Sequence, residues 1–151
     1  MKLESRLFGP INYEPEDIIH FPNGLPSFND EHQFLLIPMD PDGHGPFCLQ
    51  SITTPALTFI LMNPFSLCPD YAPVLRQNEQ KELGVHDDKD LCFYVLCAMK
   101  RPVHTSTVNL KCPIALNPDT RTAIQVILET DQFHMRHLLS EFSHSKEDAP
   151  C

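Results

Sequence analysis

The chain has 151 residues, of which 42% are hydrophobic and 21% charged, and its formal net charge is −9. A chain of this length fits one domain and can bury a core without the help of a disulfide or a metal. The acidic balance disfavours direct nucleic-acid binding, because that binding depends on Lys and Arg side chains that neutralise phosphates.

The negative charge is concentrated in the first half of the chain. No Lys or Arg lies between Arg6 and Arg76, whereas the residues between them include the acids Glu14, Glu16, Asp17, Asp30, Glu31, Asp40, Asp42 and Asp70. Residues 7–75 therefore contribute −8 of the net charge of −9. An acidic surface of this kind would attract a basic protein partner.

The sequence contains no pattern typical of a membrane protein or of an exported one. No apolar run approaches the ~18 residues that a membrane span needs. Residues 1–6 alternate in charge and lack the apolar core of a signal peptide. We therefore expect a cytoplasmic monomer whose six cysteines are reduced thiols, used as small apolar residues.

The prolines restrict the fold class. There are fifteen of them, against five glycines. Before Pro73 the longest proline-free run, residues 27–37, has only eleven residues. Proline inside a helix costs ~3 kcal/mol, so helices of normal length fit only within residues 74–101 and 119–149. This excludes a helical bundle, and it leaves no room for the crossover helices of a parallel α/β fold.

Short β-rich segments lie between the prolines. Residues 3–7 alternate in polarity at the period of a strand, and residues 91–99 form a continuous apolar run typical of a central strand buried on both faces. The other predicted strands are residues 34–37, 57–62, 105–110, 114–117 and 122–128. This spacing predicts an all-β, single-domain, antiparallel β-barrel-like fold with one or two short helices.

Two segments are predicted to be helical. Residues 78–84 read as two turns that begin at an Asn78 cap and end at Gly84. Residues 133–142 are predicted to form a terminal helix. We place the barrel domain at residues 1–138 and a polar C-terminal tail at residues 139–151.

No pattern of residues predicts catalysis or a cofactor. The sequence lacks a nucleophile elbow, a P-loop and a dinucleotide fingerprint, so we expect a protein that is not an enzyme. His134 and His137 have the i, i+3 spacing that could share a metal on a helix, but nothing nearby completes a tetrahedral set. Cys92 and Cys97, five apart on one strand, should point to opposite faces. A small all-β carrier of a metal or ligand, using Cys and His, remains the alternative function.

A proline-framed loop is the candidate binding site. Residues 63–73 present two aromatic rings, Phe65 and Tyr71, in a segment held by prolines. Rigid aromatic side chains lose little entropy on binding and dominate protein interfaces. The rings could equally close one end of the barrel. The candidate partner-binding residues are Asn63, Pro64, Phe65, Pro69, Asp70, Tyr71, Asn109 and Asn117.

The order of the motifs resembles the FliW family of bacterial flagellar assembly factors. The resemblance rests on residues 8–11, 19–28, 34–36, 46–51, 63–65, 69–71, 82–85, 108–114 and 125–128, in that order. It extends from Lys2 to about His137, and it is specific through the order and spacing of the motifs rather than through any single one.

The resemblance implies an all-β, barrel-like domain with two protein partners in the bacterial cytoplasm. One partner is newly made flagellin. The other is CsrA, a small, basic RNA-binding regulator that represses translation of the flagellin messenger. Free flagellin would titrate the protein away from CsrA, and flagellin synthesis would then slow. The implied role is to chaperone flagellin and to antagonise CsrA by occupancy alone.

Overall fold

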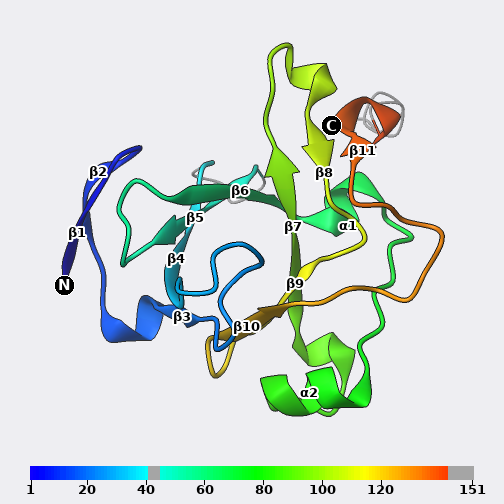
Figure 1. The fold of residues 1–151 in the computed structure, drawn as a ribbon, viewed down its shortest axis with the longest axis horizontal. Helices are drawn as coiled ribbons and strands as arrows, with labels where there is room; N and C mark the ends of the chain where they lie inside the picture. Colours follow the sequence, from blue (N-terminus) through cyan, green and yellow to red (C-terminus); the bar gives the residue numbers. More distant parts are fainter. Residues whose placement is uncertain (41–44, 143–151) are drawn as a thin grey trace.

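The computed structural model describes residues 1–40 and 45–142, and most of its elements are short strands (Figure 1). The strands are β1 Lys2–Ser5, β2 Gly9–Asn12, β3 Ile19–His20, β4 Gln33–Pro38, β5 Phe47–Ser51, β6 Thr58–Met62, β7 Cys92–Ala98, β8 Thr107–Val108, β9 Ile114–Asn117, β10 Thr122–Gln125 and β11 His137–Leu138. The helices are α1 Pro64–Leu67 and α2 Gln77–Leu83, with 3-10 turns η1 Pro15–Asp17, η2 Asp88–Asp90, η3 Val103–Thr105 and η4 Leu139–Phe142.

Seven of these strands close into a barrel. The order is β7-β6-β5-β4-β3-β10-β9, and β9 pairs back onto β7 to complete the ring. All neighbours in the ring are antiparallel except β3 and β10, which are parallel and meet at the single pair Thr122 and His20. The predicted all-β barrel is therefore confirmed. β8 and β11 extend from the end of β7, outside the ring.

β7 is the central strand, as its apolar run predicts. It pairs with β6, β8 and β9. Successive side chains of a strand alternate between faces. Phe93 and Val95 pack into one buried cluster, under α1 and residues 126–133, whereas Tyr94 and Leu96 pack against the cluster inside the barrel. β7 thus separates two cores.

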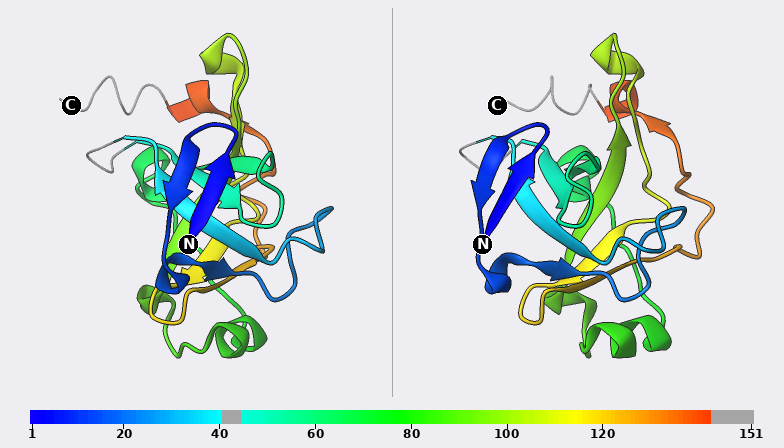
Figure 2. Two further views of the ribbon diagram at one scale, coloured as in Figure 1. Left: turned by 90° about the vertical axis from the view of Figure 1, so that its left-hand side faces the viewer. Right: turned by 60° about the vertical axis from the view of Figure 1, so that its left-hand side comes forward.

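A separate two-stranded hairpin, β1–β2, lies over the outside of β4 and β5 (Figure 2). Leu3 is buried there with Ile18 and Leu35 in a third apolar cluster. The Ser5 hydroxyl donates a hydrogen bond of 2.8 Å to Oε1 of the buried Gln50, which fixes the hairpin to the barrel wall.

The predicted helix near residue 80 is present as α2, with one correction. It begins at Gln77, after an Arg76 N-cap, so Asn78 is not the cap. The cap lies at Arg76 because its backbone N–H donates to Oε1 of Glu79, 2.8 Å away. The end is as predicted: Gly84 has φ +73° and terminates the helix in the left-handed conformation that glycine adopts readily.

The predicted helix at residues 133–142 is wrong. Lys111 N–H donates to the His134 carbonyl, and His137 and Leu138 pair with β8, so this stretch runs extended until the short η4 turn. Residues 139–142 were assigned to a polar tail, yet Leu139 and Phe142 pack against the buried cluster around β7. The rest of the proposed tail, residues 143–151, lies outside the described residues. Within residues 1–40 and 45–142, no helix is long and apolar enough to cross a membrane.

Candidate partner-binding site

The proline-framed loop of residues 63–73 begins with a short helix. The Asn63 side chain caps α1 by accepting a hydrogen bond of 2.9 Å from the Phe65 N–H, and Pro64 occupies the first helical turn, where its missing N–H has no cost. Pro64 is buried, whereas Asn63 and Phe65 are exposed. Pro69 and Asp70 follow α1 and are also exposed. The predicted rigidity of this loop thus has a local cause.

Tyr71 is buried, which for this ring favours the packing role over presentation to a partner. Its side chain is only 3% exposed, and its hydroxyl donates a hydrogen bond of 2.7 Å to the Leu110 carbonyl. The ring packs edge-on against Phe133, with centroids 4.9 Å apart. Burial raises the pKa of the Tyr71 phenol. Of the two rings, only Phe65 reaches the surface, with 40% of its area exposed.

The side chains of Asn109 and Asn117 hydrogen-bond to the backbone. The Asn109 Oδ1 accepts from the Cys112 N–H at 3.0 Å. Asn117 is 4% exposed; its Nδ2 donates to the Leu83 carbonyl at 2.8 Å, and its Oδ1 accepts from the Asp119 N–H at 3.0 Å. A role of these two amides in partner binding stays a prediction.

A groove beside the loop brings together residues that the sequence does not single out. It has a volume of about 390 Å³ and lies between residues 70–76 and residues 127–133. These two segments, which precede α2 and β11 respectively, run along the right-hand side of Figure 1. The buried side chains of Leu75, Leu128 and Phe133 line it, and so do the exposed side chains of Val74 and Ile127. We call it the lateral groove.

The lateral groove is acidic. Its lining includes the carboxylates of Asp70, Glu79 and Glu129 and one cation, Arg76, so three negative charges less one positive charge leave −2. Nη2 of Arg76 lies 2.8 Å from Oε1 of Glu129, and its Nη1 lies 3.5 Å from Oε2 of Glu79. Asp70 has no ion-pair partner within the described part of the chain. A cation brought by a partner would be attracted to this site.

Sequence reasoning missed Val74 and Ile127 because both stand in apolar runs. Ile127 lies between Val126 and Leu128, in a segment predicted to be a strand, and a continuous apolar run predicts burial on both faces. In the structure Val126 and Leu128 are buried, but Ile127 is 56% exposed. Nothing in the sequence alone could have shown that none of residues 1–40 and 45–142 covers the outer face of this segment.

The candidate metal ligands His134 and His137 lie side by side, with their rings stacked and the centroids 5.3 Å apart. The His134 N–H donates to Nε2 of His137 at 2.8 Å, and Nδ1 of His137 lies 3.2 Å from Oε1 of Glu141, so both ring nitrogens of His137 already have partners. In the described residues no group of three or more His, Cys, Asp or Glu could hold a metal ion. Cys92 and Cys97 belong to the two different cores beside β7, as their spacing predicts.

Three of the five thiols in the described part of the chain are buried. Cys48, Cys97 and Cys112 are each at most 9% exposed, whereas Cys68 and Cys92 are half-buried. Burial raises the pKa of each of the three buried thiols because it disfavours the thiolate. These cysteines act as apolar core residues, as expected.

The fold and surface together define a small β-barrel protein with an acidic groove on its side. The family model described as "FliW protein" matches residues 2–139. The chain therefore belongs to the FliW family.

Named relatives and a solved structure agree with this assignment. A protein named flagellar assembly factor FliW from Geobacillus sp. (strain WCH70) is 36% identical over 140 residues, which are 92% of this chain and 95% of the relative. One of the same name from Desulfitobacterium hafniense (strain Y51) is 36% identical over 146 residues, 97% of this chain and 94% of the relative. A crystal structure of the flagellar assembly factor FliW superposes with a TM-score of 0.85 at 34% identity, covering 92% of this chain and 96% of that one.

Proposed function

We propose that this protein is a cytoplasmic flagellar assembly factor that binds flagellin and CsrA as a monomer. It antagonises the repression of flagellin synthesis by CsrA and chaperones flagellin before export. The mechanism is occupancy: each complex withholds one partner from its other interactions, and no bond is made or broken. The protein itself does not contact RNA in this circuit.

The observation that carries the proposal is the family match over residues 2–139, supported by the structural likeness at 34% identity. The surface is compatible with it. Residues 7–75 carry eight acids and no Lys or Arg, and the lateral groove is acidic, which suits a basic partner better than a phosphate backbone. The described residues give the alternative, a metal carrier, no ligand set.

The proposal is tested by calorimetry of the purified protein against monomeric flagellin and, separately, against CsrA. We expect heat and a stoichiometry of about one to one with flagellin, whose disordered ends would become ordered on binding. Absence of heat with both partners, together with empty pull-downs, would overturn the proposal.

The salt dependence of association with CsrA tests the electrostatic part of the proposal. The association rate with basic CsrA should fall as ionic strength rises, because the Debye length shortens to ~8 Å at physiological strength and screens the acidic surface. Stopped-flow measurements from low to high salt report this rate. An association rate that does not change with salt contradicts electrostatic steering, although it leaves the complex itself intact.

A further inference from the structure

We propose that the lateral groove is a docking site for a partner segment in which basic side chains stand beside apolar ones. The inference deepens the proposed function, on which it rests for the identity of the partner protein, the basic regulator CsrA. Three properties of the groove support it: two exposed apolar side chains, an excess of carboxylates, and walls that are fixed before a partner arrives.

The apolar contribution comes from Val74 and Ile127. They are 73% and 56% exposed, they come from segments more than fifty positions apart in the sequence, and both line the groove. Single exposed apolar residues are normal, but apolar side chains that converge on one concave surface mark interaction sites.

The charge specifies the chemistry of the occupant. Arg76 is already engaged by Glu79 and Glu129, so the groove carries uncompensated negative charge. Asp70 is exposed at the same groove and has no ion-pair partner in the described residues. A Lys or Arg of the partner that approaches Asp70 would relieve this imbalance, whereas an acidic segment would be repelled. The groove therefore selects a basic segment with apolar neighbours.

The two walls of the groove need little rearrangement when a partner binds. The first wall is residues 70–76, and the second is residues 127–133. The Arg76 side chain, on the first wall, reaches Glu129 on the second at 2.8 Å. Leu75 N–H donates to Oδ2 of Asp88 at 3.2 Å, and Nζ of Lys111 donates to the Thr130 carbonyl at 2.7 Å. Each wall is thus anchored to a neighbouring element as well as to the other wall. A surface held in this way loses little conformational entropy on binding, which favours affinity.

Lysine substitutions test the site with a matched control. Val74→Lys and Val103→Lys add the same charge at exposed valines, 73% and 60% exposed, but only Val74 lines the groove. We expect Val74→Lys to raise the Kd for CsrA tenfold or more, and Val103→Lys to change it less than twofold. Val74→Asp, which removes the apolar contact but adds an attractive charge, should weaken binding much less than Val74→Lys. Melting temperatures should match the wild type, since both side chains are exposed.

A synthetic probe tests the groove without either natural partner. A short peptide of alternating Leu and Lys is titrated into methyl-labelled protein, and a Leu–Glu peptide of the same length is the control. We expect saturable NMR shifts of the Val74 and Ile127 methyl groups with the Lys peptide only, and none at Val103.

The outcomes separate the two proposals. If the wild type binds neither CsrA nor flagellin but the Lys peptide shifts both methyl groups, the proposed function fails and the groove site stands. If CsrA binds the Val74→Lys and Val103→Lys variants equally, or if the Lys peptide shifts neither methyl group, the groove site is overturned. A loss of self-association in Val74→Lys would identify a second copy of the chain as the occupant, and it too would overturn the site.

Discussion

Tyr71 connects the proline-framed loop to two distant segments. Its hydroxyl bonds to the Leu110 carbonyl, and its ring packs between Phe65 and Phe133 at centroid distances of 5.9 and 4.9 Å. Phe65 in turn meets Phe93 of the central strand, 6.3 Å away. The loop is therefore held by a chain of edge-on aromatic contacts, a favourable geometry for such rings. Tyr71 contributes to the position of this surface without itself being accessible.

Replacing Tyr71 should change stability rather than recognition. Tyr71→Phe leaves the buried Leu110 carbonyl without its donor, which should cost about 1–3 kcal/mol of unfolding free energy. Tyr71→Ala adds a cavity and should cost about 3–5 kcal/mol, as for other large aromatic side chains. Urea denaturation measures both. A Tyr71→Ala protein that melts like the wild type but loses one partner would contradict the core assignment.

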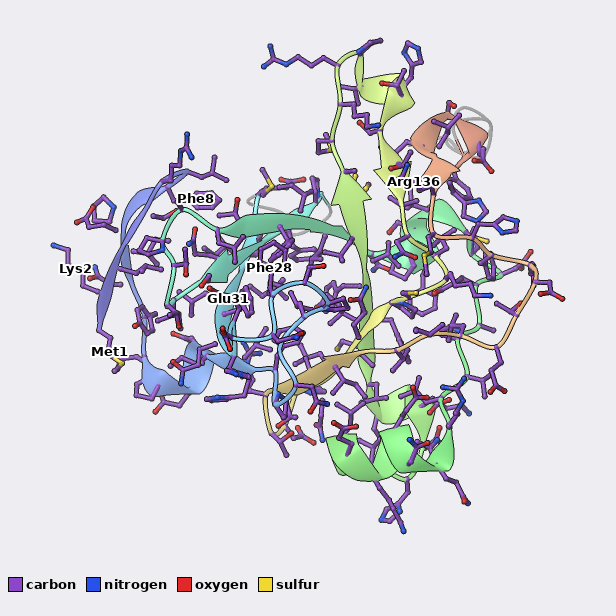
Figure 3. The ribbon with its side chains drawn as sticks, in the orientation of Figure 1. Met1, Lys2, Phe8, Phe28, Glu31 and Arg136 are labelled. Carbon is purple, nitrogen blue, oxygen red and sulfur yellow. The ribbon has the colours of Figure 1, made fainter. Side chains whose placement is uncertain are left out.

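Among the elements, the connection between β3 and β4 is anchored in the core and turns at a glycine. It carries Leu25 into the barrel core, and Phe28, seen with Glu31 in Figure 3, packs edge-on against Phe59 of β6 at 5.3 Å. The chain reverses at Gly24, where φ is +66° and the N–H donates to the Phe21 carbonyl at 3.0 Å. The tight turn at Gly24 therefore sets the path of the connection between β3 and β4.

Two glycines with nearly the same φ allow the cost of backbone strain to be distinguished from the cost of steric crowding. A Cβ at Gly24 would lie 2.6 Å from the Asn29 carbonyl oxygen, whereas a Cβ at Gly9, φ +69°, would meet nothing within 4 Å. Gly9→Ala should cost about 1–2 kcal/mol, the strain of the left-handed region alone. Gly24→Ala should cost clearly more, because backbone must move as well. Chemical denaturation of the two variants compares them. Equal losses of stability would show that the turn relaxes freely.

The elements that follow from local rules were predictable from the sequence. The prolines exclude helices of normal length from the first half of the chain, where only the four-residue α1 and the turn η1 occur. A strand is expected at residues 114–117, where the structure has β9. Gly84 ends α2 because a left-handed residue is needed there. The helix predicted at residues 133–142 is absent because the conformation of this segment depends on β8 and on Lys111, which hydrogen-bond to it from distant positions.

Less of the candidate site could be predicted. Asp70 and Phe65 lie at the surface as expected, but whether Tyr71 faces solvent is decided by Phe133, 62 positions later, and by Leu110. The same limit applies to Val74, whose exposure follows from how the segment before α2 runs beside residues 127–133. Side-chain type identifies candidates, whereas exposure is a property of tertiary neighbours, which no local pattern contains.

At the scale of the whole molecule, the buried ionisable groups are distributed over several parts of the core. Cys97, Cys112 and Tyr71 lie on the side of β7 that faces α1 or close to it, and Cys48 lies in β5, in the barrel wall. Burial is the largest cause of the raised pKa of each of these groups. The folded protein therefore favours the protonated form of each group. As a consequence, the free energy of unfolding depends on pH in the alkaline range.

The free energy of unfolding should fall as pH rises above about 8.5, the ordinary pKa of a free thiol. Above that pH the unfolded chain releases these protons while the folded protein retains them, so fewer protons are bound in the unfolded state and the slope is negative. Each buried thiol contributes at most ~1.4 kcal/mol per pH unit. Urea titrations between pH 7 and pH 10 with a reductant present should be level below about pH 8 and decline beyond it. Cys48→Ala should make the decline shallower whatever it does to stability at neutral pH. A level profile up to pH 10 would show that the thiols ionise as readily in the folded protein as in the unfolded chain. The same slope in Cys48→Ala would show this for Cys48.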